Sequence, residues 1–242
     1  MDRDYIAEYF DIPHHAILFA LIYRSAFEAL GDDGADACDE GTKLYGLERG
    51  GRMAQRALAN GDELTMRSYL LYGEWEDKNE LSASEVDAYT PVYKSSVTRC
   101  GWCKAWEENG LLEYGKNYCN FVDKYLVKGF NQENKININS TLSHGEECCA
   151  FEWLGFSLSN ADEKREYAMD KARLADSVTK DFLYHSGHLL SAMTRALEEH
   201  LSQHDAQSII AVAMADFNKL YGDEMTQALL KESQKDFTYC EE

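Results

Sequence analysis

The sequence predicts an α+β fold, namely a predominantly helical single domain with a small central antiparallel β-sheet. Only two prolines, Pro13 and Pro91, occur among 242 residues, and so few helix breakers favour long helices. Apolar residues recur at helical spacing in the first and last thirds of the chain. Between them, residues 135–139 alternate strictly between polar and apolar, and residues 149–154 follow a turn-prone Ser-His-Gly. These two segments predict an antiparallel hairpin, the clearest β element of the chain.

No linker, low-complexity tract or repeat of fixed period divides the chain, so we expect one domain over residues 1–242. It would comprise a helical N-terminal part at about 1–80, a central part with the sheet at about 85–160, and C-terminal helices at about 161–235.

Two further segments of the central region are not helical in pattern. Residues 77–85 are polar and typical of a loop. Residues 86–98 are rich in Val, Tyr and Thr and indicate a strand, which Pro91 interrupts or places at a sheet edge.

The helices are expected from apolar spacing together with start and stop signals. Pro13 fits the start of the first helix and Gly31 its end, while Asp205 is a good N-cap for a late helix. Glycines at positions 46, 50 and 51 weaken the second helix, which indicates close backbone packing or a place that something must approach. The predicted helices cover residues 13–30, 38–59, 64–72, 103–108, 111–127, 161–201 and 205 to about 221 or beyond.

Charge argues against two classes of partner. The chain carries 43 Asp and Glu against 24 Lys and Arg, a formal net charge of −19. Such a surface repels the phosphates of nucleic acids and the anionic lipids of membranes. The longest apolar run, residues 16–23, is far shorter than the roughly twenty residues of a membrane-spanning helix, and the N-terminus lacks the pattern of a secretory signal. We therefore expect a cytoplasmic protein that binds neither nucleic acid nor membranes.

Seven cysteines without an export signal argue against a disulfide scaffold. Cys100 and Cys103 form a C-x-x-C pair, but a structural zinc site needs four ligands. The second pair would require Cys119 with Cys148 or Cys149, and adjacent cysteines rarely both bind one ion. Packing is therefore the favoured interpretation of these thiols. We expect no cofactor, and a metal ion bound by Cys and His stays open as the alternative.

Two segments combine a thiol with groups that a site could use. Cys119 and Asp123 are four apart and share a face of a predicted helix. The carboxylate alone would raise the pKa of the thiol, so the pair is either packing beside a polar group or part of a site that holds a further cation or imidazole. A Gly-Phe-Asn turn then presents the amide of Asn131. On the hairpin, Cys149 and Phe151 point to one face, which is a core face unless it lines a pocket.

The late helix and the second helix supply further candidates. His185 shares an apolar stripe with Val178 and Phe182, and His188 lies beside it three residues on. A histidine on such a stripe is most often a core residue, but two imidazoles at this spacing can divide acid, base and ligand roles. Arg52, with another arginine four residues on, could clamp a substrate carboxylate, and salt bridges to the many acidic residues are the alternative.

Taken in order, these motifs resemble the L-2-amino-thiazoline-4-carboxylic acid hydrolase family. The resemblance covers most of residues 40–220 and is strongest over 98–153, although Gln132 replaces the usual proline after the Phe-Asn turn. A Tyr-His-x-x-His-Leu run at residues 184–189 is similar to the family's C-terminal helix. The motifs that carry the resemblance are Cys100 with Trp102, Cys119 with Asp123, the turn at Asn131, and Gly145-x-x-x-Cys149-x-Phe151.

The resemblance implies a hydrolase that opens a small cyclic amidine-like ring, L-2-amino-thiazoline-4-carboxylate or a related heterocycle, to an N-carbamoyl amino acid. Our hypothesis leaves the attacking group open between a cysteine thiol and a water that one of the two histidines activates. Asp123 would orient the imidazole or stabilise a protonated amidine. The catalytic candidates are Cys119, Asp123, His185, His188 and Cys149, and the substrate-binding candidates are Arg52, Asn131, Trp102 and Phe151.

A second interpretation is a non-enzymatic small-molecule-binding or sensing domain on the same scaffold, because a shared fold does not fix the function. In either case the expected partner is a small molecule. Self-association to a homo-oligomer stays open.

Overall fold

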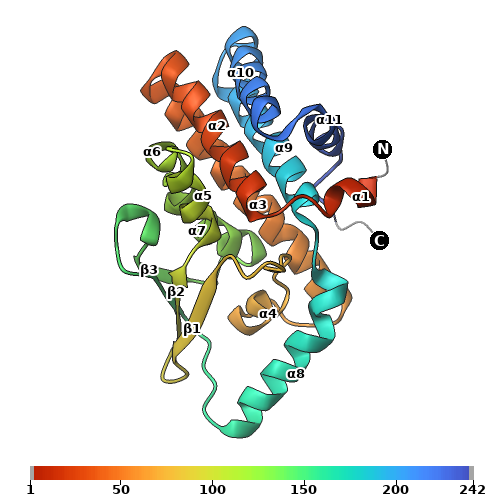
Figure 1. Cartoon of the computed structure of the whole chain (residues 1–242). Helices are drawn as coiled ribbons and strands as arrows, with labels where there is room; N and C mark the ends of the chain where they lie inside the picture. The colour runs from red at the N-terminus through yellow and green to blue at the C-terminus, as the bar shows by residue number, and fades with distance from the viewer. Residues whose placement is uncertain (1–2, 240–242) are drawn as a thin grey trace. The chain divides into compact units, whose positions relative to one another are not determined.

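The structure is a computed structural model that describes residues 3–239, apart from the side chain at position 176. Helices dominate, and four antiparallel strands form one sheet in the order β1-β2-β4-β3, which confirms the predicted α+β class (Figure 1). Contacts group the chain into two compact units that are interleaved in sequence. The prediction of a single domain with three consecutive parts stays a prediction. The division falls inside two continuous helices, α3 (Asp32–Ala59) and α7 (Tyr118–Phe130).

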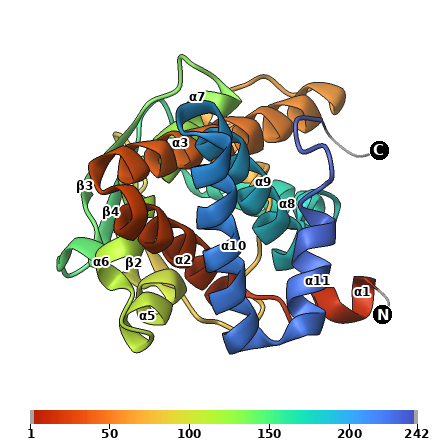
Figure 2. The ribbon, with the colours of Figure 1, turned by 90° about the horizontal axis from the view of Figure 1, so that it is seen from above.

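Unit 1 comprises Met1–Tyr45, Gly101–Val122 and Asp181–Asp236. Its central helix, α2 (Ile12–Leu30), packs against α5, α6, α9 and α10, and its residues are therefore buried on nearly every side. In Figure 2, α10 and the α5–α6 pair flank this helix, α2. Besides the first part of α3 and of α7, the unit contains α1 (Arg3–Ala7), α2 (Ile12–Leu30), α5 (Gly101–Glu108), α6 (Leu112–Gly115), α9 (Phe182–His200), α10 (Gln203–Tyr221) and α11 (Asp223–Glu232).

The start of α2 shows how local sequence sets a helix boundary. The Asp11 carboxylate accepts a hydrogen bond from the Ile12 backbone N–H at 2.7 Å, and the Asp11 backbone N–H donates to His14 Nδ1 at 3.1 Å. Pro13 occupies the first turn, where its missing N–H costs nothing. Gly31 ends the helix at a φ of 61°. The predicted start and end are therefore confirmed.

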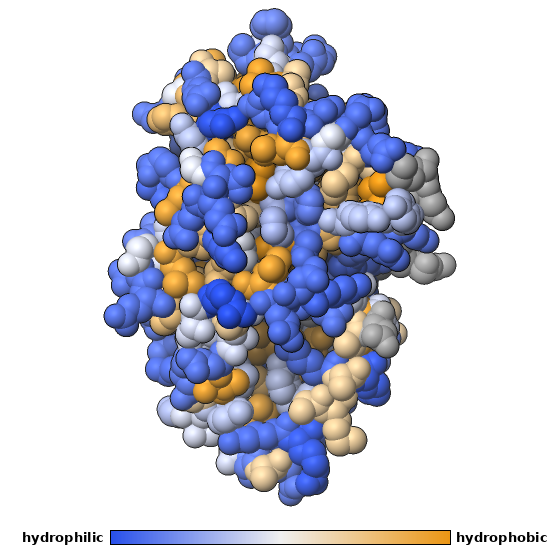
Figure 3. Space-filling view, viewed as in Figure 1, coloured by the Kyte–Doolittle hydropathy of each residue, from blue (hydrophilic) through white to orange (hydrophobic). Residues whose placement is uncertain are grey.

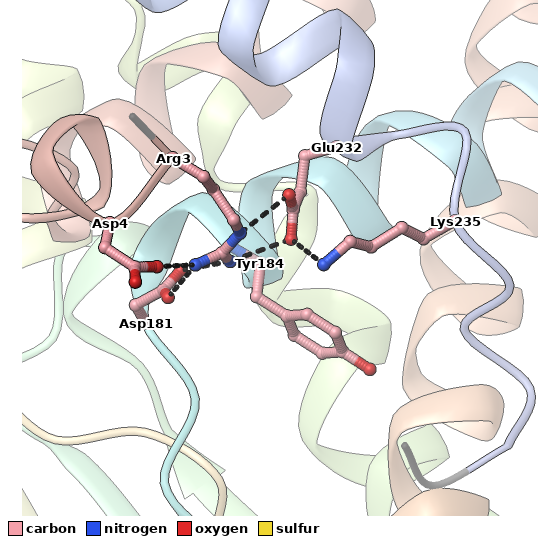
Figure 4. Close-up of polar contacts among 6 residues, drawn as sticks. All are labelled: Arg3, Asp4, Asp181, Tyr184, Glu232 and Lys235. Carbon is pink, nitrogen blue, oxygen red and sulfur yellow. Dashed lines mark hydrogen bonds and ion pairs between the residues drawn. The ribbon is translucent and has the colours of Figure 1, made fainter. Parts of the chain in front are cut away.

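A polar cluster ties the short N-terminal helix to the rest of unit 1 (Figure 4). Arg3 pairs through Nη2 with Glu232 of α11 at 2.8 Å and through Nη1 with Asp181 at 2.9 Å. Asp181 is also the N-cap of α9, and Lys235 pairs with Glu232 at 2.9 Å. One arginine thus joins α1 to the first turn of α9 and the last turn of α11.

Unit 2 comprises Gly46–Cys100, Asp123–Lys180 and Phe237–Glu242. Its apolar core joins side chains of α3, α4, α7 and α8 to Phe156 and Leu158, with Trp153 of β4 packed against it. Antiparallel pairing places Trp153 opposite both Tyr93 of β2 and Ile136 of β3. The unit contains α4 (Met66–Leu71), β1 (Ala83–Ala88), β2 (Tyr93–Arg99), β3 (Ile136–Ser140), the 3-10 turn η1 (Leu142–His144), β4 (Cys149–Trp153) and α8 (Ala161–Val178), besides the second part of α3 and of α7.

Close backbone packing explains the glycines of α3 and α7. A Cβ at Gly50 would lie 2.1 Å from the carbonyl oxygen of Leu126, and one at Gly129 would lie 2.3 Å from that of Leu47. The two helices therefore cross at glycine in both partners, within unit 2. This confirms close packing as one reason for glycine in the second predicted helix.

Several predicted boundaries are wrong. The expected loop at 77–85 overlaps β1, and the expected strand at 86–98 is two strands, because Pro91 lies in the turn between β1 and β2. The expected helix at 111–127 is α6 followed by α7, and α3 starts six residues before the expected position 38. The hairpin of β3 and β4 is confirmed as an antiparallel pair.

The predicted single helix at 161–201 is also wrong. It is two helices, because Thr179 adopts an extended conformation and the Asp181 carboxylate caps a new helix by accepting from the Tyr184 N–H at 2.8 Å. Val178 therefore ends α8 and does not share a helical stripe with His185. Asp205 is not the N-cap of the following helix either, since Ser202 takes that position and accepts from the Asp205 N–H at 3.1 Å.

The face of the molecule in Figure 3 is dominated by hydrophilic side chains, in line with the acidic composition. Within residues 3–239, no helix has both the length and the apolar character of a membrane span.

Candidate active site

Three arginines on one face of α3 converge on a buried glutamate in unit 2. Arg52 Nη2 lies 3.0 Å from Glu74 Oε2, and its Nε donates to Oε1 at 3.3 Å. Arg49 Nε lies 3.4 Å from the same Oε2, and Arg56 pairs with Oε1. Positions 49, 52 and 56 share a helix face. Their spacing in the sequence therefore explains why all three arginines can reach Glu74. Three guanidinium groups thus surround one buried carboxylate.

Arg52 is the most buried of the three arginines. Its side chain and that of Glu74 are completely buried, and Arg52 Nη1 donates to the carbonyl oxygen of Phe237 at 2.6 Å. These contacts give Arg52 a structural role. Its role in binding a substrate carboxylate stays a prediction. Arg49, which sequence reasoning did not single out, is the cation that acts on Asp123.

Asp123 is the second component of the site. It lies on the part of α7 that belongs to unit 2, and the residue is partly exposed to solvent. Burial raises the pKa of the Asp123 carboxyl to about 6, although the positive charge of Arg49 acts to lower it. The side chain makes no hydrogen bond to another described residue. A carboxyl that titrates near neutrality and is open to a ligand or water suits acid–base chemistry.

Two more side chains lie within the electrostatic range of Asp123. Tyr69 of α4 is buried, which raises the pKa of its hydroxyl, and the Asp123 charge adds to the shift while Arg49 opposes it. Its ring lies 5.7 Å from that of Phe130 and 5.9 Å from that of Trp153. We call Arg49, Tyr69, Asp123 and Cys149 the Asp123 cluster, since they come from four elements of unit 2 and three of them act on or respond to the Asp123 charge.

Cys149 of β4 is the fourth member. Its Sγ accepts a hydrogen bond from the Leu142 N–H at 3.3 Å. Burial raises the pKa of the thiol to about 11, and negative charge at Cys100 and Asp123 adds to the effect. Cys149 is therefore a neutral thiol near pH 7 and a poor nucleophile in the free protein.

The two other predicted residues of unit 2 have clear local roles. Asn131 donates from Nδ2 to the Leu64 carbonyl oxygen at 2.7 Å and accepts from the Glu133 N–H at 3.0 Å, so it holds the turn that was expected there. Phe151 stacks on Trp153 with ring centroids 5.5 Å apart. Substrate binding by either residue stays a prediction.

The predicted histidines lie in a different set of contacts, within unit 1. His188 is fully buried, and its ring lies 4.6 Å from that of Tyr45. The Tyr45 hydroxyl lies 3.3 Å from Nε2 of His15, whose Nδ1 accepts from Trp102 Nε1 at 3.1 Å. His15 was missed by sequence reasoning, and its only signal was its place on the apolar first helix. The structure thus links Trp102 to His188 through two buried side chains.

His185 and Cys119 also belong to unit 1. His185 is buried, with its ring 5.8 Å from that of Phe182. Cys119 is partly buried on α7, directly after Tyr118, whose ring lies 5.6 Å from that of His15. Cys119 and the histidines are thus in one unit, and Asp123 and Cys149 in the other. The convergence of all of them at one cavity stays a prediction.

The six cysteines of the described chain form no disulfide, and Cys240 lies outside it. No group of three or more His, Cys, Asp or Glu side chains in residues 3–239 is placed to hold a metal ion.

An α+β protein with an ionisable carboxyl beside a cation has the elements of an acid–base site for an anionic substrate. Comparison with known proteins identifies the class. The model of the L-2-amino-thiazoline-4-carboxylic acid hydrolase family matches residues 11–153, and the chain belongs to this family. Searches of curated proteins and of solved structures found no match. The matched segment contains every member of the Asp123 cluster and Cys119, and it ends before His185 and His188.

Proposed function

We propose that this protein hydrolyses a small cyclic amidine that carries a carboxylate, L-2-amino-thiazoline-4-carboxylate or a close relative, at the Asp123 cluster. Family membership supports the reaction class. The observation that carries the choice of site is Asp123 itself, a partly exposed carboxyl with a pKa of about 6 beside the cation Arg49. The whole cluster lies in the matched segment and in one compact unit.

In this proposal Arg49 attracts the substrate carboxylate and Asp123 activates water. The positive charge of Arg49 acts on Asp123, and guanidinium groups recognise carboxylates, which favours an anionic substrate. At pH 7 a carboxyl with a pKa of about 6 is mostly ionised, so it can accept a proton, and its basicity exceeds that of an ordinary aspartate. The Tyr69 hydroxyl stays protonated and can donate a hydrogen bond to the amidine or to the developing negative charge.

The chemistry consumes one water per substrate. The water oxygen bonds to the ring carbon between sulfur and nitrogen as its proton passes to Asp123. Attack moves the electron pair of the carbon–nitrogen double bond onto the ring nitrogen, which takes the second proton of the water. The tetrahedral intermediate then collapses to a carbonyl with rupture of the carbon–sulfur bond. Asp123 returns its proton to the departing sulfur, and the product is an N-carbamoyl amino acid with a free thiol. The carboxyl ends in its starting state, as a catalyst requires.

A water nucleophile agrees better with the environment of Cys149 than direct attack by its thiol. A thiol with a pKa of about 11 is almost entirely protonated near pH 7, and the thiolate is the reactive form. Attack by Cys119, or by water that His185 or His188 activates, remains the competing assignment.

The test is turnover of L-2-amino-thiazoline-4-carboxylate followed by mass spectrometry of the product. We expect Asp123→Asn to lower kcat by about 10²–10⁴-fold, the usual contribution of a general base. Asp33→Asn, at an exposed position of α3, is the matched control and should keep full activity. For the wild-type protein, kcat/KM should fall as pH decreases through about 6, because the base must be ionised.

Cysteine and histidine variants separate the competing assignments. Cys149→Ser, Cys119→Ala and His188→Gln should each keep at least about a tenth of the activity if water and Asp123 carry the reaction. Loss of turnover in Cys119→Ala with turnover intact in Asp123→Asn would contradict the proposed site. A thermal shift by the substrate without any product would instead favour the binding or sensing interpretation, since a ligand at a hundred times its Kd adds about 2.7 kcal/mol of stability.

A further inference from the structure

Unit 2 contains a pocket that the proposed reaction does not use. It has a volume of about 480 Å³, and none of the members of the Asp123 cluster lines it. Tyr89 and Tyr93, at the turn between β1 and β2, form one side, and one face of α8 forms the other. A volume of this size lies within the range of small-molecule sites. We call it the tyrosine pocket.

The hollow has a simple origin in the sequence of α8. Ala168, Ala172 and Ala175 fall on one helix face at spacings of four and three, and all three line the pocket. Their short side chains leave room where larger residues would fill the space against the sheet. Tyr167, on the same face, closes the pocket with an aromatic ring 6.4 Å from that of Tyr93.

The walls are suited to a flat aromatic group. The rings of Tyr89 and Tyr93 have centroids 5.9 Å apart and are nearly perpendicular, at 72°. Together with Tyr167 they present ring faces and edges at several orientations, and aromatic rings bind one another in offset or edge-to-face geometry. Leu158 adds an apolar surface.

The charge of the pocket is opposite to that of the protein. Lys164 and Lys171 line it, and its described lining includes no Asp or Glu, although the chain has a net charge of −19. Lys164 lies 3.5 Å from the centroid of the Tyr89 ring, so its charge is already engaged. Lys171 makes no hydrogen bond or ion pair with another described residue. Neighbouring protein atoms partly desolvate its ammonium group, which lowers its pKa.

Two acidic residues of α8, Asp162 and Asp170, form ion pairs with arginines that do not line the pocket. Asp170 pairs with Arg67 at 2.7 Å and with Arg173 at 3.1 Å, and Asp162 pairs with Arg165 at 2.8 Å. Lys171 is thus the cation of the pocket that an anionic group can approach. We propose that the tyrosine pocket binds a small aromatic carboxylate, with the ring among the tyrosines and the carboxylate at Lys171.

The proposal is tested by titrating the full chain with naphthalene-2-carboxylate and with its neutral analogue naphthalene-2-carboxamide. We expect the carboxylate to bind at least about tenfold more tightly, as a charge-assisted contact requires. Lys171→Gln should abolish this difference without weakening the carboxamide. Ala172→Leu, at an exposed helical position that leucine tolerates, should weaken both ligands about tenfold or more by filling the hollow. Lys78→Gln, in an exposed loop, is the matched control and should bind like the wild type.

Results of three kinds would overturn the proposal. The first is equal binding of the two ligands, or no binding of either at millimolar concentration, in the wild type. The second is a difference between them that survives in Lys171→Gln, or affinities that Ala172→Leu leaves unchanged. The third is a self-association of the protein that Ala172→Leu abolishes, which would assign the pocket to a second copy of the chain.

Discussion

At the scale of single residues, Asp123 shows a conflict between stability and chemistry. A carboxyl in a desolvated position favours its protonated form, and here its pKa rises from 3.8 to about 6 despite Arg49. Folding at neutral pH must therefore ionise a group in an environment that disfavours the charge. Positions where a protein tolerates such a cost are often functional. A structural interpretation of Asp123 would have to explain why an uncharged side chain does not take its place.

Asp123→Asn is expected to stabilise the protein near pH 7. Because the pKa is higher in the folded than in the unfolded state, the wild type loses stability as pH rises from about 4 to about 6, and the neutral variant does not. The gain at pH 7 should be about 1–2 kcal/mol, less than the full equivalent of the shift because the side chain is partly exposed. Urea unfolding at pH 4 and pH 7 measures it.

The comparison needs the same control as the kinetic test. Asp33→Asn should change stability little at either pH. A variant Asp123→Asn that is less stable than the wild type at pH 7 would show that the ionised carboxylate stabilises the fold, and would contradict the environment described here.

At the scale of elements, the crossing of α3 and α7 positions the site. Arg49 and Asp123 lie on these two helices, and glycine lets the helix backbones approach each other beside them. The side chains of the site are therefore set by a backbone contact rather than by loops. Substitutions at Gly50 and at the adjacent Gly51 can test how much this backbone contact contributes to stability.

Gly50→Ala and Gly51→Ala should have opposite effects. A Cβ at Gly50 would lie 2.1 Å from Leu126 O, so the helices must separate, at a cost of about 2–4 kcal/mol. A Cβ at Gly51 would meet nothing within 4 Å, and alanine should stabilise the helix by about 0.5–1 kcal/mol. Chemical denaturation measures both. Equal effects of the two substitutions would show that helix propensity alone, without the crossing, decides stability here.

The ion pairs between Glu74 and the arginines of α3 are a second contact that holds elements of unit 2 together. Glu74 lies beyond the end of α4 and brings a completely buried carboxylate to three arginines of one helix. Its backbone carbonyl oxygen also accepts from the Lys180 N–H at 2.7 Å, between α8 and α9. One residue thus connects segments that are far apart in sequence.

Glu74→Gln should destabilise the protein by about 3–5 kcal/mol, because it removes the charge of a completely buried carboxylate that pairs with three guanidinium groups. Glu113→Gln is the control, since Glu113 is in an exposed pair with Lys116 and should cost less than about 1 kcal/mol. The midpoint of denaturant unfolding reports both variants. A small effect of Glu74→Gln would mean that water or another anion compensates the arginines.

At the scale of the whole molecule, two compact units share two continuous helices. The chain enters and leaves each unit several times, and the divisions at Tyr45 and at Val122 fall inside α3 and α7. Because helix formation is cooperative, unfolding of such a helix in one unit should also destabilise its continuation in the other unit. If the chain is a single domain, both units should unfold together, and the cooperativity of thermal unfolding can be measured.

We expect one cooperative unfolding transition in scanning calorimetry, with equal calorimetric and van't Hoff enthalpies. The Gly50→Ala substitution in unit 2 should move the entire transition to lower temperature. Two separate peaks, or a shift of only part of the heat absorption in Gly50→Ala, would show that the units unfold independently and would contradict the single-domain prediction.

Much of the fold was accessible from sequence because it depends on near neighbours. Helix α2 was predicted to within one residue, since its proline, its apolar spacing and its terminal glycine are local signals. The hairpin was predicted from its alternation. The break between α8 and α9 was missed, because Asp181 and Thr179 are ordinary residues that act only through their hydrogen bonds. Less of the site was accessible, and Arg49, Tyr69 and His15 carried no distinctive local pattern.

By itself the sequence determined the fold class, the family and the acidic balance, because these depend on residue spacing and composition. Only the tertiary structure decided which charges are buried together. Arg49 and Arg52 occupy the same face of one helix, yet Arg52 is enclosed with Glu74 whereas Arg49 also acts on Asp123. Burial and pKa depend on groups distant in sequence, which packing alone brings together.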